Sequence, residues 1–383
     1  NWTHRSCLID WQLTTLIVTP APRAARKDHG TFFEEYPVPG RPLPILLLSA
    51  RSCSLVALAV LFCLVGSSQA ESVPEEPVVV GSWNLEWFFD ADPADNRSPL
   101  AKQQSAPSEP DWIWKRDAVA DVIGKMAPTI LAVQEVENRQ VLVELAEQIK
   151  KKYQLAYRVA FINGYDSYTE QDVGYLFRAD LVQFSRREQT REMYDSRTYY
   201  NLSKHLFARF QWGTGEQTET LTLVNVHLRA GEKAQALREK QCRLIRYWVD
   251  PLLAAGENVI VLGDLNASED CDKTRPDGDV GTLCRAAAGA RQRALTDLHE
   301  KLNPSHRATH MIGRQFDRIL VSPSLLKDTP DRLDLVYESI QCPHELVVRG
   351  ERDQDHRDRF YQIPVAERDI SDHYPLLVAF KRK

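Results

Sequence analysis

Polar side chains that can bind a metal ion or carry a proton stand where predicted apolar strands end. A single Asp or Asn at a strand end is usually a turn or capping residue, and a single His or Glu there is most often a surface residue. Six such positions in one chain are more informative, because ligands of layered sheet folds bind at strand ends. The sequence therefore predicts one site assembled from the ends of several strands. Its candidate residues, in chain order, are Asn84 and Glu86, Glu135, His227, Asp264 and Asn266, Asp317, and Asp372 and His373.

Most of these candidates carry hard oxygen atoms, which are the ligands that Mg²⁺, Mn²⁺ and Ca²⁺ prefer. His227 and His373 add groups that transfer protons or stabilise charge. The sequence contains no Gly-x-Ser-x-Gly nucleophile motif and no Walker-type phosphate loop. The inventory favours metal-assisted attack of water on phosphorus. The oxygen donors are Asn84, Glu86, Glu135, Asp264, Asn266 and Asp372.

Short apolar runs alternate with segments of helical spacing, and these elements must position the candidates. Strands outnumber helices, which predicts sheets with helices packed outside them in one continuous domain. Asn84 and Glu86 are expected to share a face, because residues two apart on an extended chain point the same way. Strands are predicted at residues 77–83, 129–134, 154–162, 173–178, 207–212, 219–228, 257–263, 315–322 and 375–380, helices at 112–126, 137–152 and 232–255, and loops at 90–111 and 345–369.

The amino-terminal region has the features of a targeting segment. Residues 55–65 are an unbroken apolar run that follows Arg51, and the small residues Ser68 and Ala70 come after it. Charge, a short apolar core and small residues in this order predict a secretory signal. A membrane anchor that reaches back to Ile45, or a buried helix, is the alternative, although the run is shorter than the ~20 residues of a membrane span. Residues 1–40 are interpreted as an upstream or disordered segment, 41–70 as the signal segment and 71–383 as the functional domain.

Four of the seven cysteines lie in the predicted mature domain. Cys271 and Cys284 flank a Gly- and Asp-rich segment, the kind of exposed loop that a disulfide closes. By elimination, Cys242 and Cys342 form the other candidate pair. Zinc is disfavoured, because no Cys-x-x-Cys spacing occurs.

The formal net charge is −5. Proteins that coat nucleic acid tightly are usually basic, because phosphate contacts supply most of their affinity. The acidic balance weighs weakly against such a protein. It does not weigh against an enzyme that gathers carboxylates around a metal ion and binds its substrate briefly.

The motifs around the candidates, taken together, resemble those of a known family. SWNLEWF, QEVEN, NVHLRAG, LGDLNAS, QFDRILV and SDHYPLLV occur in this order. They are similar to motifs of the endonuclease/exonuclease/phosphatase superfamily and of its deoxyribonuclease I-like members, over about residues 78–380. The resemblance implies an α/β fold, a four-layered sandwich of two mixed β-sheets face to face with helices outside.

The resemblance also implies a function for each candidate. It implies that Asn84, Glu86, Glu135 and Asp372 bind the metal ion, Mg²⁺ or Mn²⁺ with Ca²⁺ left open, and that Asn84 also positions the phosphate. It implies that His227 contacts the scissile phosphate, that Asp264 activates water beside the amide of Asn266, and that His373, oriented by Asp317, stabilises the transition state.

Glu170 and Arg229 are two further candidates. The segment SYTEQDVGYLFR is similar to a deoxyribonuclease segment in which a glutamate pairs with the phosphate-contacting histidine. Glu170 would then pair with His227, with Asp172 as a competitor for that position. Arg229 is a candidate phosphate contact, because guanidinium binds phosphate in a bidentate manner. A solvated loop arginine is the alternative for Arg229.

The resulting hypothesis is a secreted or periplasmic monomeric nuclease that hydrolyses DNA, with RNA left open, and has no stable membrane association. The alternative is a secreted phosphatase or phospholipase, sphingomyelinase-like or acting on inositol phosphates. The inositol option is weakened because Arg-Gln-Phe-Asp-Arg replaces the Trp-Cys-Asp-Arg usual in 5-phosphatases. A non-catalytic binding protein on this fold is disfavoured by the presence of Glu135, His227, Asp264 and His373.

Overall fold

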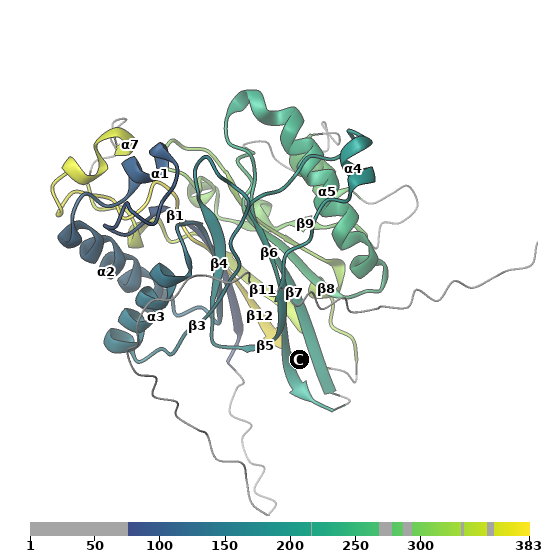
Figure 1. Cartoon of the computed structure of the whole chain (residues 1–383). Helices are drawn as coiled ribbons and strands as arrows, with labels where there is room; N and C mark the ends of the chain where they lie inside the picture. Colours follow the sequence, from purple (N-terminus) through teal and green to yellow (C-terminus); the bar gives the residue numbers. More distant parts are fainter. Residues whose placement is uncertain (1–75, 216, 268–277, 286–292, 331–332, 351–355) are drawn as a thin grey trace, which may run out of the picture. The chain divides into compact units, whose positions relative to one another are not determined.

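The computed structural model describes residues 76–383, except 216, 268–277, 286–292, 331–332 and 351–355 (Figure 1). The predictions for residues 1–40 and 41–70 therefore fall outside the described residues. Two six-stranded sheets form the centre of the described part of the chain. Among those described, no helix is both long enough and apolar enough to cross a bilayer.

The first sheet has its amino-terminal strand near the middle. Across the sheet, in order, lie β11 (Leu335–Gln341), β12 (Leu376–Arg382), β1 (Val78–Phe88), β2 (Ile130–Val136), β4 (Asp172–Phe177) and β3 (Arg158–Phe161). β1 and β2 run parallel, and the other described neighbours are antiparallel. β2 and β4 are almost entirely buried, as expected for continuous apolar strands covered on both faces.

The second sheet repeats this plan. Its strands, in order, are β5 (Asp180–Ser185), β6 (His205–Thr214), β7 (Gln217–His227), β8 (Asn258–Asp264), β10 (Asp317–Val321) and β9 (Thr296–Asp297). Here β7 and β8 form the parallel pair. Each sheet therefore contributes one parallel pair whose carboxyl ends lie together at one edge, which is where a site can form.

Helices cover the outer faces of both sheets (Figure 1). α2 and α3 pack on the first sheet and α5 packs on the second. The described chain is thus a four-layered sandwich of helices, sheet, sheet and helix, as the family resemblance implies. The helices are α1 (Pro99–Gln104), α2 (Glu109–Met126), α3 (Arg139–Tyr153), α4 (Arg191–Asp195), α5 (Gln235–Ala254), α6 (Asp279–Cys284) and α7 (His356–Arg359).

Buried polar side chains join the two sheets across an otherwise apolar core. The Gln134 side-chain amide donates to Asn225 Oδ1 over 2.8 Å, and Asn225 Nδ2 donates to the carbonyls of Val133 and Gly174. Tyr175 donates its hydroxyl to the carbonyl of Leu206 over 3.0 Å. Because an unmade buried hydrogen bond is costly, these contacts fix the register of one sheet on the other.

Several elements escaped the sequence prediction. β5 was not predicted, because it is largely exposed and its sequence lacks the apolar pattern of a buried strand. The predicted loop 90–111 contains α1 and the start of α2. The predicted solvated loop 345–369 was wrong, because His356, Arg368 and Asp369 are each only 3% exposed. A stretch of charged residues is interpreted as a surface loop when its partners are unknown, and His356 is paired with Glu86, which is far away in the sequence.

The cysteine predictions have different outcomes. Cys242 and Cys342 are free and buried, so the predicted bridge between them is wrong. Cys242 belongs to the core between α5 and the second sheet, whereas Cys342 packs in the core that includes the first sheet. Cys284 is disulfide-bonded. Cys271, its predicted partner, lies outside the described residues.

Gly263 is required where β8 leads into Asp264. Its φ is +131°, and a Cβ there would lie 2.0 Å from the carbonyl oxygen of Val226. We expect Gly263→Ala to lower the free energy of unfolding by more than about 3 kcal/mol, measured by urea denaturation. The matched control is Gly256→Ala, with φ +74° but open space around the added Cβ, which should cost about 1 kcal/mol. Equal losses in the two variants would contradict this account.

Candidate active site

The predicted residues meet where the parallel pairs of the two sheets end. Asn84 and Glu135 lie near the carboxyl ends of β1 and β2. His227 and Asp264 end β7 and β8, and they are register partners in the sheet. Asp317 begins β10 directly opposite Asp264. The sandwich thus brings side chains from both sheets to one edge.

At these strand ends the backbone adopts left-handed conformations, and the regular pairing of the strands is interrupted. Glu86 (φ 51°), Trp87 (φ 46°) and Glu135 (φ 60°) all have positive φ, and both β1 and β2 shift register there. Asn266 (φ 49°) repeats this after β8. Such conformations are uncommon for these residue types and cluster at functional sites. The simple alternation predicted for Asn84 and Glu86 is therefore replaced by a bulge.

Asn84 lies at the centre of the constellation and is completely buried. Its Nδ2 donates to Glu135 Oε1 over 3.1 Å and to Asp264 Oδ2 over 3.0 Å, and lies 3.4 Å from His373 Nε2. Its Oδ1 accepts from the backbone N–H of Glu86 over 2.9 Å. One amide therefore holds together groups from both sheets.

His373 is held between carboxylates. Its Nδ1 lies 2.7 Å from Asp317 Oδ2, and its Nε2 lies 3.7 Å from Asp264 Oδ2. Burial alone would lower the pKa of His373, but Asp317, Asp372 and Asp264 raise that pKa well above its usual value. Burial raises the pKa of Asp264, and the charge of His373 opposes this rise. The pair thus holds a proton beside a buried carboxylate.

His227 has a different environment. Its Nε2 lies 3.5 Å from Asp264 Oδ2 and 3.9 Å from Glu135 Oε1. Its buried Nδ1 has no hydrogen-bond partner among the described residues. Burial, followed by the positive charge of Lys204, lowers the pKa of His227 well below its usual value. His227 is therefore neutral in this arrangement.

The predicted pairing of Glu170 with His227 is not formed. The Glu170 carboxylate instead accepts from the backbone N–H groups of Arg97 and Ser98, just before α1. Asp172, the competing candidate, accepts from the backbone N–H of Gly164. Backbone N–H groups at the start of a helix have no partner within the helix and can donate to a carboxylate. The sequence could not show that α1 begins beside Glu170.

Asn266 and Arg229 lie at the margin of the cluster. The Asn266 backbone N–H donates to Asp264 Oδ1 over 2.8 Å, and its side chain binds the carbonyl of Leu228. Asn266 thus orients Asp264 as expected of a neighbour. Arg229 is exposed, and Gln241 and Arg238 hold its backbone N–H and carbonyl.

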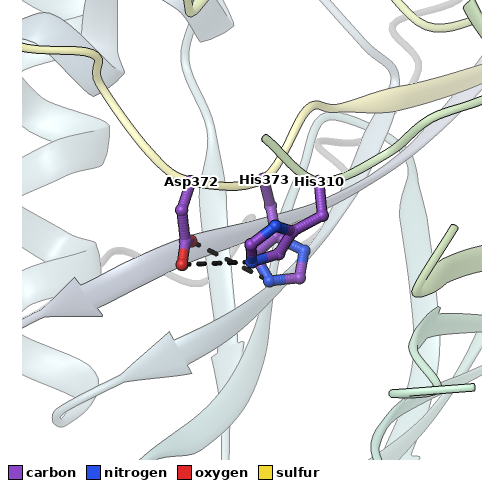
Figure 2. A group of neighbouring side chains, drawn as sticks. All are labelled: His310, Asp372 and His373. Carbon is purple, nitrogen blue, oxygen red and sulfur yellow. Dashed lines mark ion pairs between the residues drawn. The ribbon is translucent and has the colours of Figure 1, made fainter. Parts of the chain in front are cut away.

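His310 joins the site although no sequence pattern marked it. Its Nε2 lies 3.3 Å from Asp372 Oδ2, and its ring packs edge-on against His373 with 4.5 Å between centroids. Figure 2 shows the Asp372 carboxylate on one side of the two imidazoles, with dashed lines that mark its ion pairs with them. Burial would raise the pKa of Asp372, but His373 and His310 hold that pKa well below its usual range. His310 lies in a loop, so strand-end reasoning missed it.

A second group that the sequence reasoning missed surrounds Glu86. His356 Nε2 lies 3.0 Å from Glu86 Oε2, which also accepts from the backbone N–H of Asp372 over 2.9 Å. Lys115 is fully buried and donates to the carbonyl of Ile370. Burial lowers the pKa of Lys115 to about 8, while Glu86, Asp372 and Glu135 oppose this shift.

The donor set fits a divalent cation. Glu135, with its side chain 15% exposed, has a pKa raised by burial and by the negative charge of Asp372. Carboxylates that repel one another in this way are relieved by a bound cation. Glu135, His227 and Asp264 also bring one ligand atom each within 4.8 Å of one another. Hard oxygens dominate the set, which suits Mg²⁺ or Mn²⁺.

Comparison with known proteins identifies the family. The model of the endonuclease/exonuclease/phosphatase family matches residues 79–382. The chain belongs to the endonuclease/exonuclease/phosphatase family. This endonuclease/exonuclease/phosphatase domain is accordingly a metal-dependent phosphoesterase, and the constellation described above is its candidate active site. No curated protein matches the chain.

Solved structures of the same fold are distant. Truncated TDP2 from Caenorhabditis elegans is 19% identical, with 80% of this chain and 98% of that chain covered and a TM-score of 0.46. The human Nocturnin catalytic domain with bound sulfate is 16% identical (81% and 94% covered, TM-score 0.48). An endonuclease/exonuclease/phosphatase from Bacteroides vulgatus is 14% identical (81% and 100%, 0.49). Likeness at this level says nothing about the substrate of this family member.

Replacing Asp317 tests its control of His373. Asp317→Asn removes the negative charge that raises the pKa of His373, so this pKa should fall. If protonated His373 is the active form, the loss of activity at alkaline pH should move to lower pH. The rate at pH 7 should fall by about 10–100-fold. The pH dependence of kcat/KM measures both effects, and an unmoved alkaline limb would contradict the assignment.

His310 is expected to matter for activity through Asp372. His310→Ala should lower kcat by about 10–100-fold while leaving the thermal unfolding midpoint within a few degrees. His306→Ala, on the same loop and with its ring against His344, is the matched control. Steady-state kinetics with a phosphodiester substrate check the result. A His310→Ala enzyme as active as the control would place His310 outside the machinery.

Proposed function

We propose that this phosphoesterase is a nuclease that hydrolyses DNA phosphodiester bonds by direct attack of water. The observation that carries the proposal is the surroundings of Asp264, which is 1% exposed and lies next to Asn84, His227 and His373. A buried carboxylate with a raised pKa is suited to accept the proton of an attacking water. Neighbouring hydrogen-bond donors are suited to stabilise the charge that develops on phosphorus oxygens.

Each group has a distinct task in this mechanism. Asp264 orients the water and takes its proton, held in place by the backbone N–H of Asn266. His373, protonated and fixed by Asp317, donates to a phosphoryl oxygen. Neutral His227 donates one hydrogen bond to the phosphate.

A divalent cation would be held by Glu135 and Glu86, with Asn84 and Asp372 beside them. It would supply Lewis-acid polarisation of the phosphate. The same carboxylates also surround the buried ammonium group of Lys115. Lys115 thereby adds a positive charge beside these carboxylates.

A loop rich in exposed tyrosine next to His227 supports a nucleic acid substrate. Tyr165 is 66% exposed and Tyr168 is 68% exposed, and the guanidinium of Arg186 lies 5.1 Å from the Tyr165 ring centroid. Lys204 ties this loop to the site, because its Nζ binds Asp166 and its carbonyl accepts from the His227 backbone N–H. Exposed aromatic rings with nearby guanidinium groups favour stacking with bases.

The segment around α4 extends this surface. Tyr194 is 51% exposed and lies 4.9 Å from the guanidinium of Arg197, measured to the ring centroid. Tyr199 and Tyr247 contact each other edge to face. Gln241 connects the segment to the site, since it binds both the carbonyl of Asn201 and the backbone N–H of Arg229. This connection supports Arg229 as a contact for backbone phosphate, which guanidinium binds in a bidentate manner.

The proposal includes export and a monomeric enzyme without stable membrane association. Export is supported by the apolar segment 55–65 and the small residues after it. It is also supported by the disulfide at Cys284, because disulfides persist in oxidising compartments.

The decisive test is nicking of supercoiled plasmid DNA by the purified protein, with Mg²⁺, Mn²⁺ or Ca²⁺ or with a chelator. We expect metal-dependent nicking, lowered by several orders of magnitude in Asp264→Ala and in His373→Ala. Asp180→Ala is the matched control, because its carboxylate is exposed on β5. All variants should keep the circular dichroism spectrum of the parent.

Parallel assays distinguish the alternative substrates. Phosphocholine release from sphingomyelin, or phosphate release from inositol phosphates, with intact plasmid would replace the nuclease assignment by a phospholipase or phosphatase. Near-parental nicking by either active-site variant would instead overturn the assignment of the residues.

A further inference from the structure

A pocket of about 220 Å³ opens beside the candidate active site at Glu86. Its walls are Glu86 and Trp87 at the end of β1, Gln103 and Gln104 in the last turn of α1, Arg359 at the end of α7, and residues 360–362 after α7. Glu86 is one of the expected metal ligands. A group attached to a phosphate bound at the active site therefore has this pocket next to it. The volume is below the ~300–1,000 Å³ of sites for drug-sized ligands and suits a single planar ring system.

The pocket has an aromatic wall that packing holds in place. Phe360 lies 4.9 Å from the ring centroid of Tyr361, 5.1 Å from that of His356 and 5.9 Å from that of Trp114. Trp87, which also lines the pocket, packs edge to face on Phe89 with 5.3 Å between ring centroids. Rings fixed in this way can stack with a planar ligand at little entropic cost.

The rim of the pocket supplies hydrogen-bonding groups of both kinds. Gln103, Gln104 and Gln362 each carry an amide that both donates and accepts. Glutamine amides pair with the edges of nucleobases, which also present donors and acceptors side by side. Arg359 adds a guanidinium group to the lining. An aromatic wall with an amide rim matches a heteroaromatic ring better than it matches an alkyl chain.

The charges of the pocket disfavour a cationic headgroup such as choline. Aromatic walls can bind quaternary ammonium groups where the surrounding charge is negative. Here the ammonium of Lys115 already lies 4.4 Å from the Phe360 ring centroid. The carboxylate of Glu86 is paired with His356, and Arg359 is positively charged. The single guanidinium group of the lining is likewise insufficient for an inositol polyphosphate.

We propose that this pocket binds the nucleobase of the nucleotide whose phosphate occupies the active site. The inference rests on the proposed nuclease function and deepens it. The pocket gives the enzyme contact with one base next to the scissile bond, whereas the tyrosine-rich loops contact the strand further away. The enzyme should therefore bind a nucleotide more tightly than the same sugar phosphate without its base.

The test is a binding measurement that needs no turnover. Isothermal titration of the Asp264→Asn protein with Mg²⁺ compares the four common nucleoside 5′-monophosphates with ribose 5-phosphate and with phosphocholine. We expect at least one nucleotide to bind about tenfold or more tightly than ribose 5-phosphate, as base stacking predicts. Adding Gln104→Ala and Gln362→Ala should reduce that ratio to less than about threefold.

The control and the opposing outcomes are well defined. Gln140→Ala, an exposed glutamine on α3 that lies outside the pocket, should keep the full ratio. Equal affinities for nucleotide and ribose 5-phosphate, including no measurable binding of either, would refute the base pocket. Tighter binding of phosphocholine than of any nucleotide would refute it as well. Hydrolysis of bis(p-nitrophenyl) phosphate, which has no base, reports separately on the proposed phosphodiesterase function.

Discussion

The hydrogen bond from Asn84 to Asp264 is the contact on which the site depends. Asn84 lies near the end of a strand in the first sheet and Asp264 ends a strand in the second, and their atoms are 3.0 Å apart. Asp264 needs a donor because it is buried, and Asn84 supplies one while also binding Glu135. An amide between two carboxylates reduces their repulsion without a positive charge. The face-to-face packing of the sheets, pinned by Gln134 and Asn225, makes this contact possible.

Backbone conformation and electrostatics are coupled at this edge. Glu86 and Glu135 have left-handed conformations that cost free energy, and both place carboxylates near Lys115. Their negative charge is balanced by His356, by His373 and by the buried Lys115. The site is therefore arranged for charge before any substrate arrives, which is the preorganisation that catalysis of phosphoester hydrolysis requires. The packing of the two sheets offsets the free-energy cost of these backbone conformations.

The environments of His373 and His227 separate their protonation states. His373 has a carboxylate at each ring nitrogen, so it holds a proton. His227 has a carboxylate on one side only, with Lys204 acting on it electrostatically, so it is neutral. In the sequence both are histidines at predicted strand boundaries, and nothing there separates them. The difference comes from which neighbours the fold supplies and from burial, which penalises the charged form.

The sequence by itself determined the layered architecture and most of the residues at the strand ends, because buried strands are apolar runs and their polar ends stand out. Asn84, Glu135, His227, Asp264, Asp317 and His373 were all found in this way. Only the tertiary structure showed that His310, His356 and Lys115 join them, because loops and helices carry no such signal. It also showed that Glu170 binds backbone N–H groups just before α1 and does not pair with His227. Long-range contacts decide these pairings, and they depend on how two sheets and their loops pack, which the local pattern of residues does not contain.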